Sequence, residues 1–170
     1  TAVVVLAVAA VLLAIDQMLK YFVLRDLRPV GTVTVIPGLL ELTYVENTGA
    51  AFGLFKQVMW LVVAVTVVAT VAIIVLLFRY KRHSFFSYTT AALLMAGGIG
   101  NLIDRVLNGE VVDYINLLFM QFAVFNFADI CVCVGVGLWV LVIFLEELHA
   151  ENGQSPNCLL YTSDAADDLI

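Results

Sequence analysis

Residues 1–24 read TAVVVLAVAAVLLAIDQMLKYFVL, an apolar run in which Asp16 and Lys20 are the only charged side chains. A bilayer core roughly 30 Å thick requires about 20 mostly apolar residues as helix, because backbone amides that face lipid must find partners within the segment. A cleaved signal peptide is the alternative, since Ala9 and Ala10 offer small residues, but the run continues past Asp16 and no basic region precedes it. We therefore predict a membrane-spanning helix over residues 1–24.

Three further runs have similar length and composition, and they cover residues 58–78, 85–106 and 127–145. The whole chain has 170 residues, of which 63% are hydrophobic and 13% are charged. Soluble domains contain about half apolar residues, so water is not the main solvent of this chain. We predict an all-α integral membrane protein with four transmembrane helices in one domain, over residues 1–150, surrounded by membrane lipids. The formal net charge of −6 gives no reason to expect a nucleic acid partner.

A β-rich segment separates the first two apolar runs. Residues 31–36 (GTVTVI) and 39–44 (LLELTY) alternate in polarity, and the dipeptide Pro37-Gly38 between them is a turn signal. We predict a small hairpin-like cap on one membrane face, within about residues 25–56. Residues 108–125 mix apolar and polar side chains, and we expect them to lie along the membrane interface.

Residues 151–170 begin with a polar segment and then show no helical apolar period. We interpret them as a non-native or disordered tail, of the kind that a translated sequencing adaptor produces. The three cysteines, Cys131, Cys133 and Cys158, form no Cys-x-x-Cys pair. We therefore predict neither a disulfide framework nor a zinc site.

Polar side chains inside the apolar runs are expensive in lipid and need an explanation. Asp16 and Lys20 are four residues apart and share a helix face, so a structural ion pair is the favoured interpretation. One broad face of the third run carries Gly97, Asn101, Asp104 and Arg105. Small residues on such a face indicate helix packing. The guanidinium of Arg105 and the side-chain amide of Asn101, by contrast, could bind the carbonyl groups of an extended peptide.

Two carboxylates are predicted to lie on the same side of the membrane. Asp113 stands among apolar neighbours, and Asp129 opens the fourth run, where it also fits the acidic first turn of a capped helix. Like charges a few Å apart cannot both ionise, so such a pair would share one proton. One carboxylate then acts as base toward water and the other as acid toward a scissile carbonyl, which is aspartic protease chemistry without a metal. We expect the ionised form at Asp129 and the protonated form at Asp113.

Other hydrolytic chemistries find little support. His83 lies among basic residues and His149 lies near the tail, so neither is placed to activate a serine or cysteine nucleophile. The chain has no His-Glu-x-x-His pattern for a catalytic metal. A transporter or proton-relay protein is the alternative from another class, and it would depend most on Asp16 and Asp104. A catalytically inactive membrane scaffold is the third possibility, and it would tolerate changes at both Asp113 and Asp129.

The orientation in the membrane is weakly determined by basic residues. Arg79, Lys81 and Arg82 form a dense cluster between the second and third runs, whereas Arg25, Arg28 and Lys56 lie on the other side. The counts are equal, and only the density favours a cytoplasmic loop at residues 79–82.

The chain resembles the lipoprotein signal peptidase (signal peptidase II) family in five short blocks that follow the family's order. These are DQMLK (16–20), ENTGAAFG (46–53), GGIGNLIDR (97–105), VVDYI (111–115) and FNFAD (125–129). The resemblance implies an aspartic endopeptidase that cleaves the signal peptide from diacylglyceryl-modified bacterial prolipoproteins, just before the lipidated cysteine. It implies no cofactor and a multi-pass protein of the bacterial cytoplasmic (inner) membrane, with its active site near the extracytoplasmic face. We expect this enzyme to be a monomer.

The resemblance also assigns roles to individual residues. Asp113 and Asp129 would form the catalytic pair. The substrate-binding residues would be Asn47, Gly97, Asn101, Arg105 and Asn126. Structural support would come from Asp16, Lys20 and Asp104, and the segment after the first span would form the cap.

Overall fold

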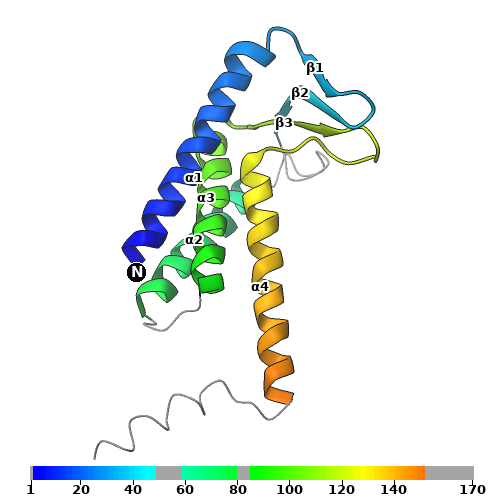
Figure 1. The fold of residues 1–170 in the computed structure, drawn as a ribbon. Helices are drawn as coiled ribbons and strands as arrows, with labels where there is room; N and C mark the ends of the chain where they lie inside the picture. Colours follow the sequence, from blue (N-terminus) through cyan, green and yellow to red (C-terminus); the bar gives the residue numbers. More distant parts are fainter. Residues whose placement is uncertain (1, 49–58, 80–84, 152–170) are drawn as a thin grey trace, which may run out of the picture.

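The structure, a computed structural model, describes residues 2–48, 59–79 and 85–151. Four long helices form a bundle in the described residues, and a small sheet lies at one end of it (Figure 1). The helices are α1 (Ala2–Phe22), α2 (Met59–Arg79), α3 (Phe85–Asn108) and α4 (Phe127–Glu151). A π-helical turn, η1 (Val23–Leu27), continues α1 toward the sheet. The bundle therefore follows the four apolar runs of the sequence.

Length and composition make three of the helical segments able to cross a membrane. They are Ala2–Leu27, Phe85–Asn108 and Phe127–Leu145. The apolar part of α2 in the described residues, Trp60–Leu76, is shorter. The chain is a multi-pass membrane protein, as predicted, and the count of four spans stays a prediction.

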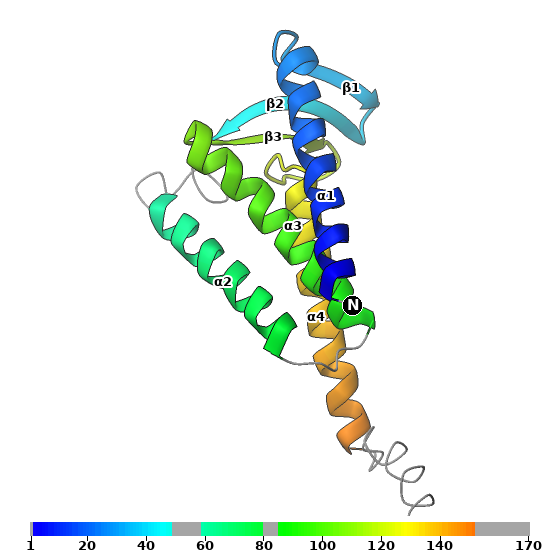
Figure 2. The same cartoon turned by 90° about the vertical axis from the view of Figure 1, so that its left-hand side faces the viewer.

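Helix α3 lies at the centre of the bundle and contacts each of the other three helices (Figure 2). Lipid tails give apolar helices no hydrophobic reason to associate, so close packing depends on small residues. A Cβ on Gly100 would come within 2.6 Å of Asp16 Oδ2 on α1, and one on Gly135 of α4 would come within 2.9 Å of Leu94 Cδ2 on α3. These glycines bring the backbones of α1, α3 and α4 close enough for polar side chains near the sheet to meet.

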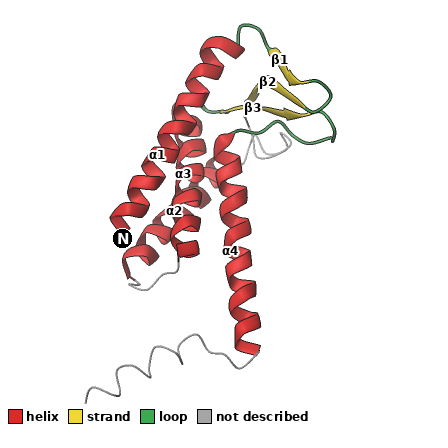
Figure 3. Cartoon of the chain, viewed as in Figure 1, coloured by secondary structure: helices red, strands yellow, loops and turns green. Residues whose placement is uncertain are grey.

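The sheet consists of β1 (Thr32–Ile36), β2 (Leu40–Asn47) and β3 (Val111–Leu117), all antiparallel and in that order (Figure 3). The predicted hairpin is confirmed: β1 pairs with β2 through a turn at which Gly38 has a φ of +72°. Strand β3 was not predicted from the sequence, which suggested only an interfacial segment over residues 108–125. Its pairing with β2 places Asp113 opposite Val45, next to a bulge in β2.

Several predictions fall outside the described residues. They concern residues 49–53 of the second sequence block, Lys56, Lys81, Arg82, His83, Cys158 and the tail beyond residue 151. Arg79 is described, and it ends α2 at the end of the bundle away from the sheet (Figure 2).

We expect Gly97→Ala to destabilise the bundle. A Cβ at this position of α3 would run into the carbonyl oxygen of Ala128 and lie 2.8 Å from Val132 Cγ2, both on α4. Overpacking of this kind costs about 1–3 kcal/mol, so the thermal unfolding temperature in detergent should fall. Gly137→Ala is the matched control, because open space surrounds Gly137 on α4 and alanine favours helix there. Equal unfolding temperatures for the two variants would contradict this account of the α3–α4 contact.

Candidate active site

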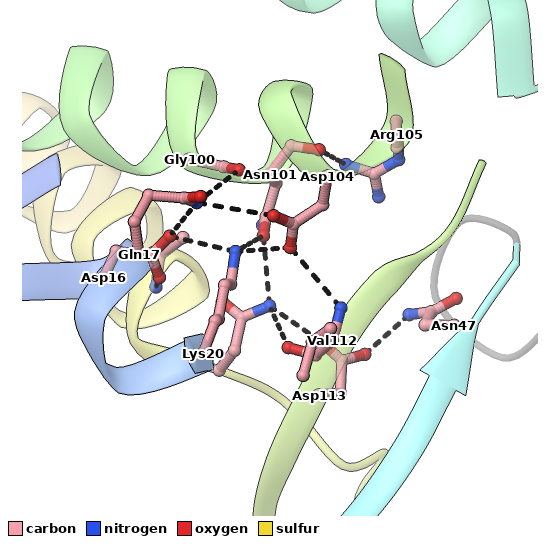
Figure 4. A network of polar contacts seen from close by, with 12 residues as sticks. Asp16, Gln17, Lys20, Asn47, Gly100, Asn101, Asp104, Arg105, Val112 and Asp113 are labelled. Atoms are coloured by element: carbon pink, nitrogen blue, oxygen red, sulfur yellow. Dashed lines mark hydrogen bonds and ion pairs between the residues drawn. The ribbon is translucent and has the colours of Figure 1, made fainter. Parts of the chain in front are cut away.

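A buried lysine holds the helices together near the sheet. Lys20 Nζ lies 2.9 Å from Asp16 Oδ2 and 2.8 Å from Asp104 Oδ2, and all three side chains are at most 5% exposed (Figure 4). The predicted pair of Asp16 and Lys20 is therefore present, and Asp104 of α3 joins it. Gln17 supports the cluster, since its Nε2 donates to Asp16 Oδ2 and Asp104 Oδ1.

Backbone groups from two other elements complete this cluster. The Ala128 amide of α4 donates to Asp16 Oδ1 at 3.1 Å, and the Val112 amide of β3 donates to Asp104 Oδ2 at 3.4 Å. Each buried carboxylate thus has an ammonium partner and an amide partner, as buried charges require. One cluster fixes α1, α3, α4 and β3 relative to one another.

Two asparagines connect this cluster to the two candidate catalytic carboxylates. Asn101 Oδ1 accepts from Lys20 Nζ at 3.1 Å and from Asn126 Nδ2 at 3.0 Å. An ammonium group only donates, so the amide oxygen of Asn101 must face Lys20 and its nitrogen must face away. That nitrogen donates to Asp129 Oδ1 at 2.7 Å. The lysine thereby sets which group of Asn101 meets Asp129.

Asn126 and Asp129 form the start of α4. The Asp129 amide donates to Asn126 Oδ1 at 2.9 Å, and the Asn126 amide donates to Asp129 Oδ2 at 3.1 Å. This reciprocal arrangement is a capping box, so the capping role that the sequence allowed for Asp129 is real. The same Asn126 side chain donates to Asp113 Oδ1 at 2.7 Å. Capping therefore does not compete with a chemical role, because it joins Asp129 to Asp113 through one residue.

Asp113 has an unusual environment on β3. The residue is 2% exposed, and Asn47 Nδ2 donates to its Oδ2 at 2.8 Å. Burial raises the pKa of Asp113 to about 6, and the charge of Asp129 acts in the same direction. The amides of Asn47 and Asn126 and the charge of Lys20 oppose that shift in pKa.

Asp113 and Asp129 line the same cavity, which has a volume of about 550 Å³. Asn47 and Arg105 are its other polar residues of note, and Arg105 Nη1 donates to the Asn101 carbonyl at 3.2 Å. Its apolar wall is formed by Leu117, Met120, Phe122, Ala123, Val124, Phe125, Ile130, Cys133 and Val134. Within the part of the chain that the structure describes, no group of three or more His, Cys, Asp or Glu side chains could hold a metal ion.

The structure places the predicted site residues in three positions relative to the cavity. Asn47, Arg105, Asp113 and Asp129 line the cavity. Asn101 and Asn126 lie behind the two carboxylates and donate to them. Gly97 lies at the α3–α4 contact and is not among the residues that line the cavity.

Sequence reasoning missed two parts of this site. It did not single out Gln17, although a polar residue beside Asp16 in an apolar run was a signal for it. It also missed residues 117–125, whose apolar side chains form much of the cavity wall.

Comparisons with known proteins show which family the chain belongs to. Residues 8–145 match the family model described as Signal peptidase (SPase) II. The chain belongs to the signal peptidase II family. Members of the signal peptidase II family are peptidases, so the cavity belongs to an enzyme that hydrolyses peptide bonds.

Individual members of the signal peptidase II family match most of the chain. A lipoprotein signal peptidase of Clostridioides difficile is 43% identical over 136 residues, which are 79% of this chain and 91% of that protein. One of Brevibacillus brevis is 32% identical over 139 residues, 82% of this chain and 93% of that protein. A solved structure, described as a bacterial membrane enzyme obtained by the in meso method at 2.3 Å resolution, is 31% identical. It superposes with a TM-score of 0.78 over 85% of this chain and 89% of that chain.

We expect Lys20→Met to destabilise the protein strongly, because it leaves Asp16 and Asp104 buried without an ammonium partner. Breaking a buried ion pair on one side costs about 3–5 kcal/mol, which thermal unfolding in detergent would detect. Arg25→Met removes an exposed pair with Asp26 and should leave the unfolding temperature unchanged. A Lys20→Met variant as stable as Arg25→Met would show that the cluster does not hold the fold.

Proposed function

We propose that this chain is an aspartic endopeptidase of the bacterial cytoplasmic membrane, with Asp113 and Asp129 as its catalytic pair. Its substrates are diacylglyceryl-modified prolipoproteins, and it cleaves just before the lipidated cysteine. One observation carries the proposal: two carboxylates line one cavity at the sheet end of the helices and share Asn126 as a hydrogen-bonding partner. The curated relatives, named lipoprotein signal peptidases, support the choice of substrate.

The proposed reaction uses one proton shared by the pair. Asp113 holds that proton, since burial favours its neutral form, and Asp129 is the ionised partner that accepts hydrogen bonds from Asn101 and the Asn126 amide. Asp129 takes a proton from water as the water oxygen bonds to the scissile carbonyl carbon, and Asp113 gives its proton to the carbonyl oxygen. In the second half, Asp129 passes its proton to the leaving nitrogen as the carbon–nitrogen bond breaks. Asp113 then recovers a proton from the tetrahedral hydroxyl.

The proposed substrate-binding residues act at different distances from the reacting atoms. The Arg105 guanidinium has five N–H donors, and the contact with the Asn101 carbonyl uses one of them, so the others can bind peptide carbonyls in the cavity. Asn47 lines the cavity and also donates to Asp113. Asn101 and Asn126 orient the two carboxylates, and Gly97 acts through the close contact of α3 with α4.

We place all four helices across the membrane, with both ends of residues 1–150 in the cytoplasm and the sheet as the extracytoplasmic cap. The arrangement of the helices supports this topology, because Arg79 ends α2 at the end away from the sheet, where the dense basic cluster begins. Every residue of the proposed site comes from one chain, so a monomer is sufficient.

The transporter alternative rests on the buried charges of Asp16 and Asp104. Both carboxylates are paired with Lys20 and satisfied by backbone amides, and neither lines the cavity that holds Asp113 and Asp129. The cluster thus has the character of structural support.

We expect Asp113→Asn and Asp129→Asn each to lower cleavage of a diacylated prolipoprotein by at least about 10³-fold, because each removes one proton-transfer group. A gel-shift assay with purified protein in detergent measures this. Asp26→Asn is the control, since Asp26 is exposed on η1 and distant in sequence from the pair. Undiminished cleavage by either variant of the pair would disprove the aspartic mechanism, whereas no cleavage by a well-folded parent would favour a transporter or scaffold.

We expect the rate of cleavage to fall as pH rises through about 6, where Asp113 loses the proton that the reaction needs. Asn47 donates to the Asp113 carboxylate and so lowers its pKa, which means that Asn47→Ala should move this fall in rate to higher pH. Asn116→Ala on the same strand as Asp113 should not move it, because Asn116 donates to Glu41 instead. A pH profile of kcat/KM, which reports the pKa values of the free enzyme, tests this for the three proteins, and a shift to lower pH in Asn47→Ala would contradict the assignment of the proton to Asp113.

A further inference from the structure

Strand β1 has one unpaired edge. It pairs with β2 on one side, and within the residues that the structure describes no strand pairs with its other side. Its five residues, TVTVI, are all exposed and include neither a charged residue nor a proline. Charged residues and prolines are what usually keep a free edge from pairing with another chain. The free edge of β1 is therefore open to an added strand.

The hydrogen bonds between β1 and β2 determine which backbone groups lie on this free edge. The Tyr44 amide donates to the Gly31 carbonyl at 2.9 Å, one residue before β1 begins. Residues of an antiparallel pair alternate between bonding to the partner strand and pointing away from it. The amide and carbonyl groups of Thr32 and Thr34 therefore point away from β2. A shift of register follows Thr34, so these two residues form the regular part of the edge.

The sheet links this edge to the candidate active site. Strand β3, which carries Asp113, lies nearest the helices, and β1 lies farthest from them (Figure 1 and Figure 2). Neighbouring strands are about 4.8 Å apart, so a strand added beyond β1 would lie about 14 Å from β3. An extended chain covers about 3.3 Å per residue. About six residues would thus connect a peptide bond held at Asp113 to the free edge, allowing for an offset along the strands.

The small size of the edge decides which partner it fits. Specific interfaces between free proteins bury at least about 1,000 Å², and an edge with two regular residues offers far less. A second copy of this chain would therefore not be held. A chain that is already anchored nearby is different, because its effective concentration at the edge reaches the millimolar range. A prolipoprotein bound at Asp113 and Asp129 is anchored in this way.

We propose that the free edge of β1 binds the mature segment of the substrate as an added extended strand, beginning about six residues after the lipidated cysteine. This site rests on the proposed function, and it lies outside the cavity that holds the two carboxylates. Pairing through backbone groups does not depend on the side chains of the added strand. The edge can therefore bind prolipoproteins whose mature segments differ in sequence.

Cleavage kinetics with three diacylated peptides test the substrate side of this proposal. A long peptide carries about 15 residues after the lipidated cysteine, and a short one carries about three, too few to reach β1. KM for the long peptide should be lower by about three- to ten-fold at equal kcat. A long peptide with alternate prolines beyond the sixth residue should behave as the short one, because proline has no amide donor. Equal KM values for all three would overturn the proposal.

Variants of β1 test the enzyme side. Thr34→Pro removes one outward amide donor at a position where an edge strand tolerates proline. It should raise KM for the long peptide to the value for the short one, and cleavage of the short peptide should stay as in the parent. Thr34→Ala is the matched control, since it keeps the amide. If Thr34→Pro folds poorly, Thr32→Pro makes the same test, and an unchanged KM for the long peptide would overturn the proposal.

Photocrosslinking tests the contact without depending on cleavage. A benzophenone-bearing amino acid placed at position 34 of the full chain should form an adduct with the long peptide. Cleavage of both peptides without this adduct, or an adduct with a second copy of the chain instead, would overturn the proposal. A chain that cleaves neither peptide but forms the peptide adduct would refute the proposed function and leave β1 as a peptide-binding edge.

Discussion

An ammonium group held between two carboxylates, in surroundings that exclude water, is the contact on which the rest of the structure depends. Lys20 meets Asp16 within its own helix and Asp104 from α3, the Ala128 amide of α4 donates to Asp16, and the Val112 amide of β3 donates to Asp104. Charges in such surroundings are costly unless every partner is in place. If any one of these elements moved away, a buried charged group would lose a partner that lipid cannot replace. The elements are therefore held in fixed positions at the sheet end of the bundle.

The same Lys20 contact also determines which hydrogen bonds the two candidate catalytic carboxylates receive. Because Lys20 can only donate, Asn101 turns its oxygen toward the cluster and its nitrogen toward Asp129. Asn126 donates to Asn101 and to Asp113 while its backbone amide donates to Asp129. The two carboxylates thus receive donors whose orientation is set several residues away. Helix capping, often a purely local matter, becomes part of the site because Asn126 serves both purposes.

The helices and the polar residues could be predicted from the sequence because their signals are local. Long apolar runs require helix in lipid, and a carboxylate four residues from a lysine indicates a pair on one face. Strand β3 could not be predicted in this way. Its residues Val111–Leu117 carry a short mixed pattern, and their strand character comes from pairing with β2, far away in the sequence. The convergence of Asp104 on Lys20 likewise depends on how α1 packs on α3, where Gly100 permits the approach.

Position relative to the membrane explains why an apolar loop and a buried acid belong to the same cavity. Burial beside apolar side chains is what raises the pKa of Asp113 to about 6 and favours the proton that the proposed reaction uses. In a soluble protein, a wall of exposed Phe and Met side chains would promote aggregation. In a membrane protein acyl chains can cover such a wall, and the wall then keeps bulk water away from the two carboxylates.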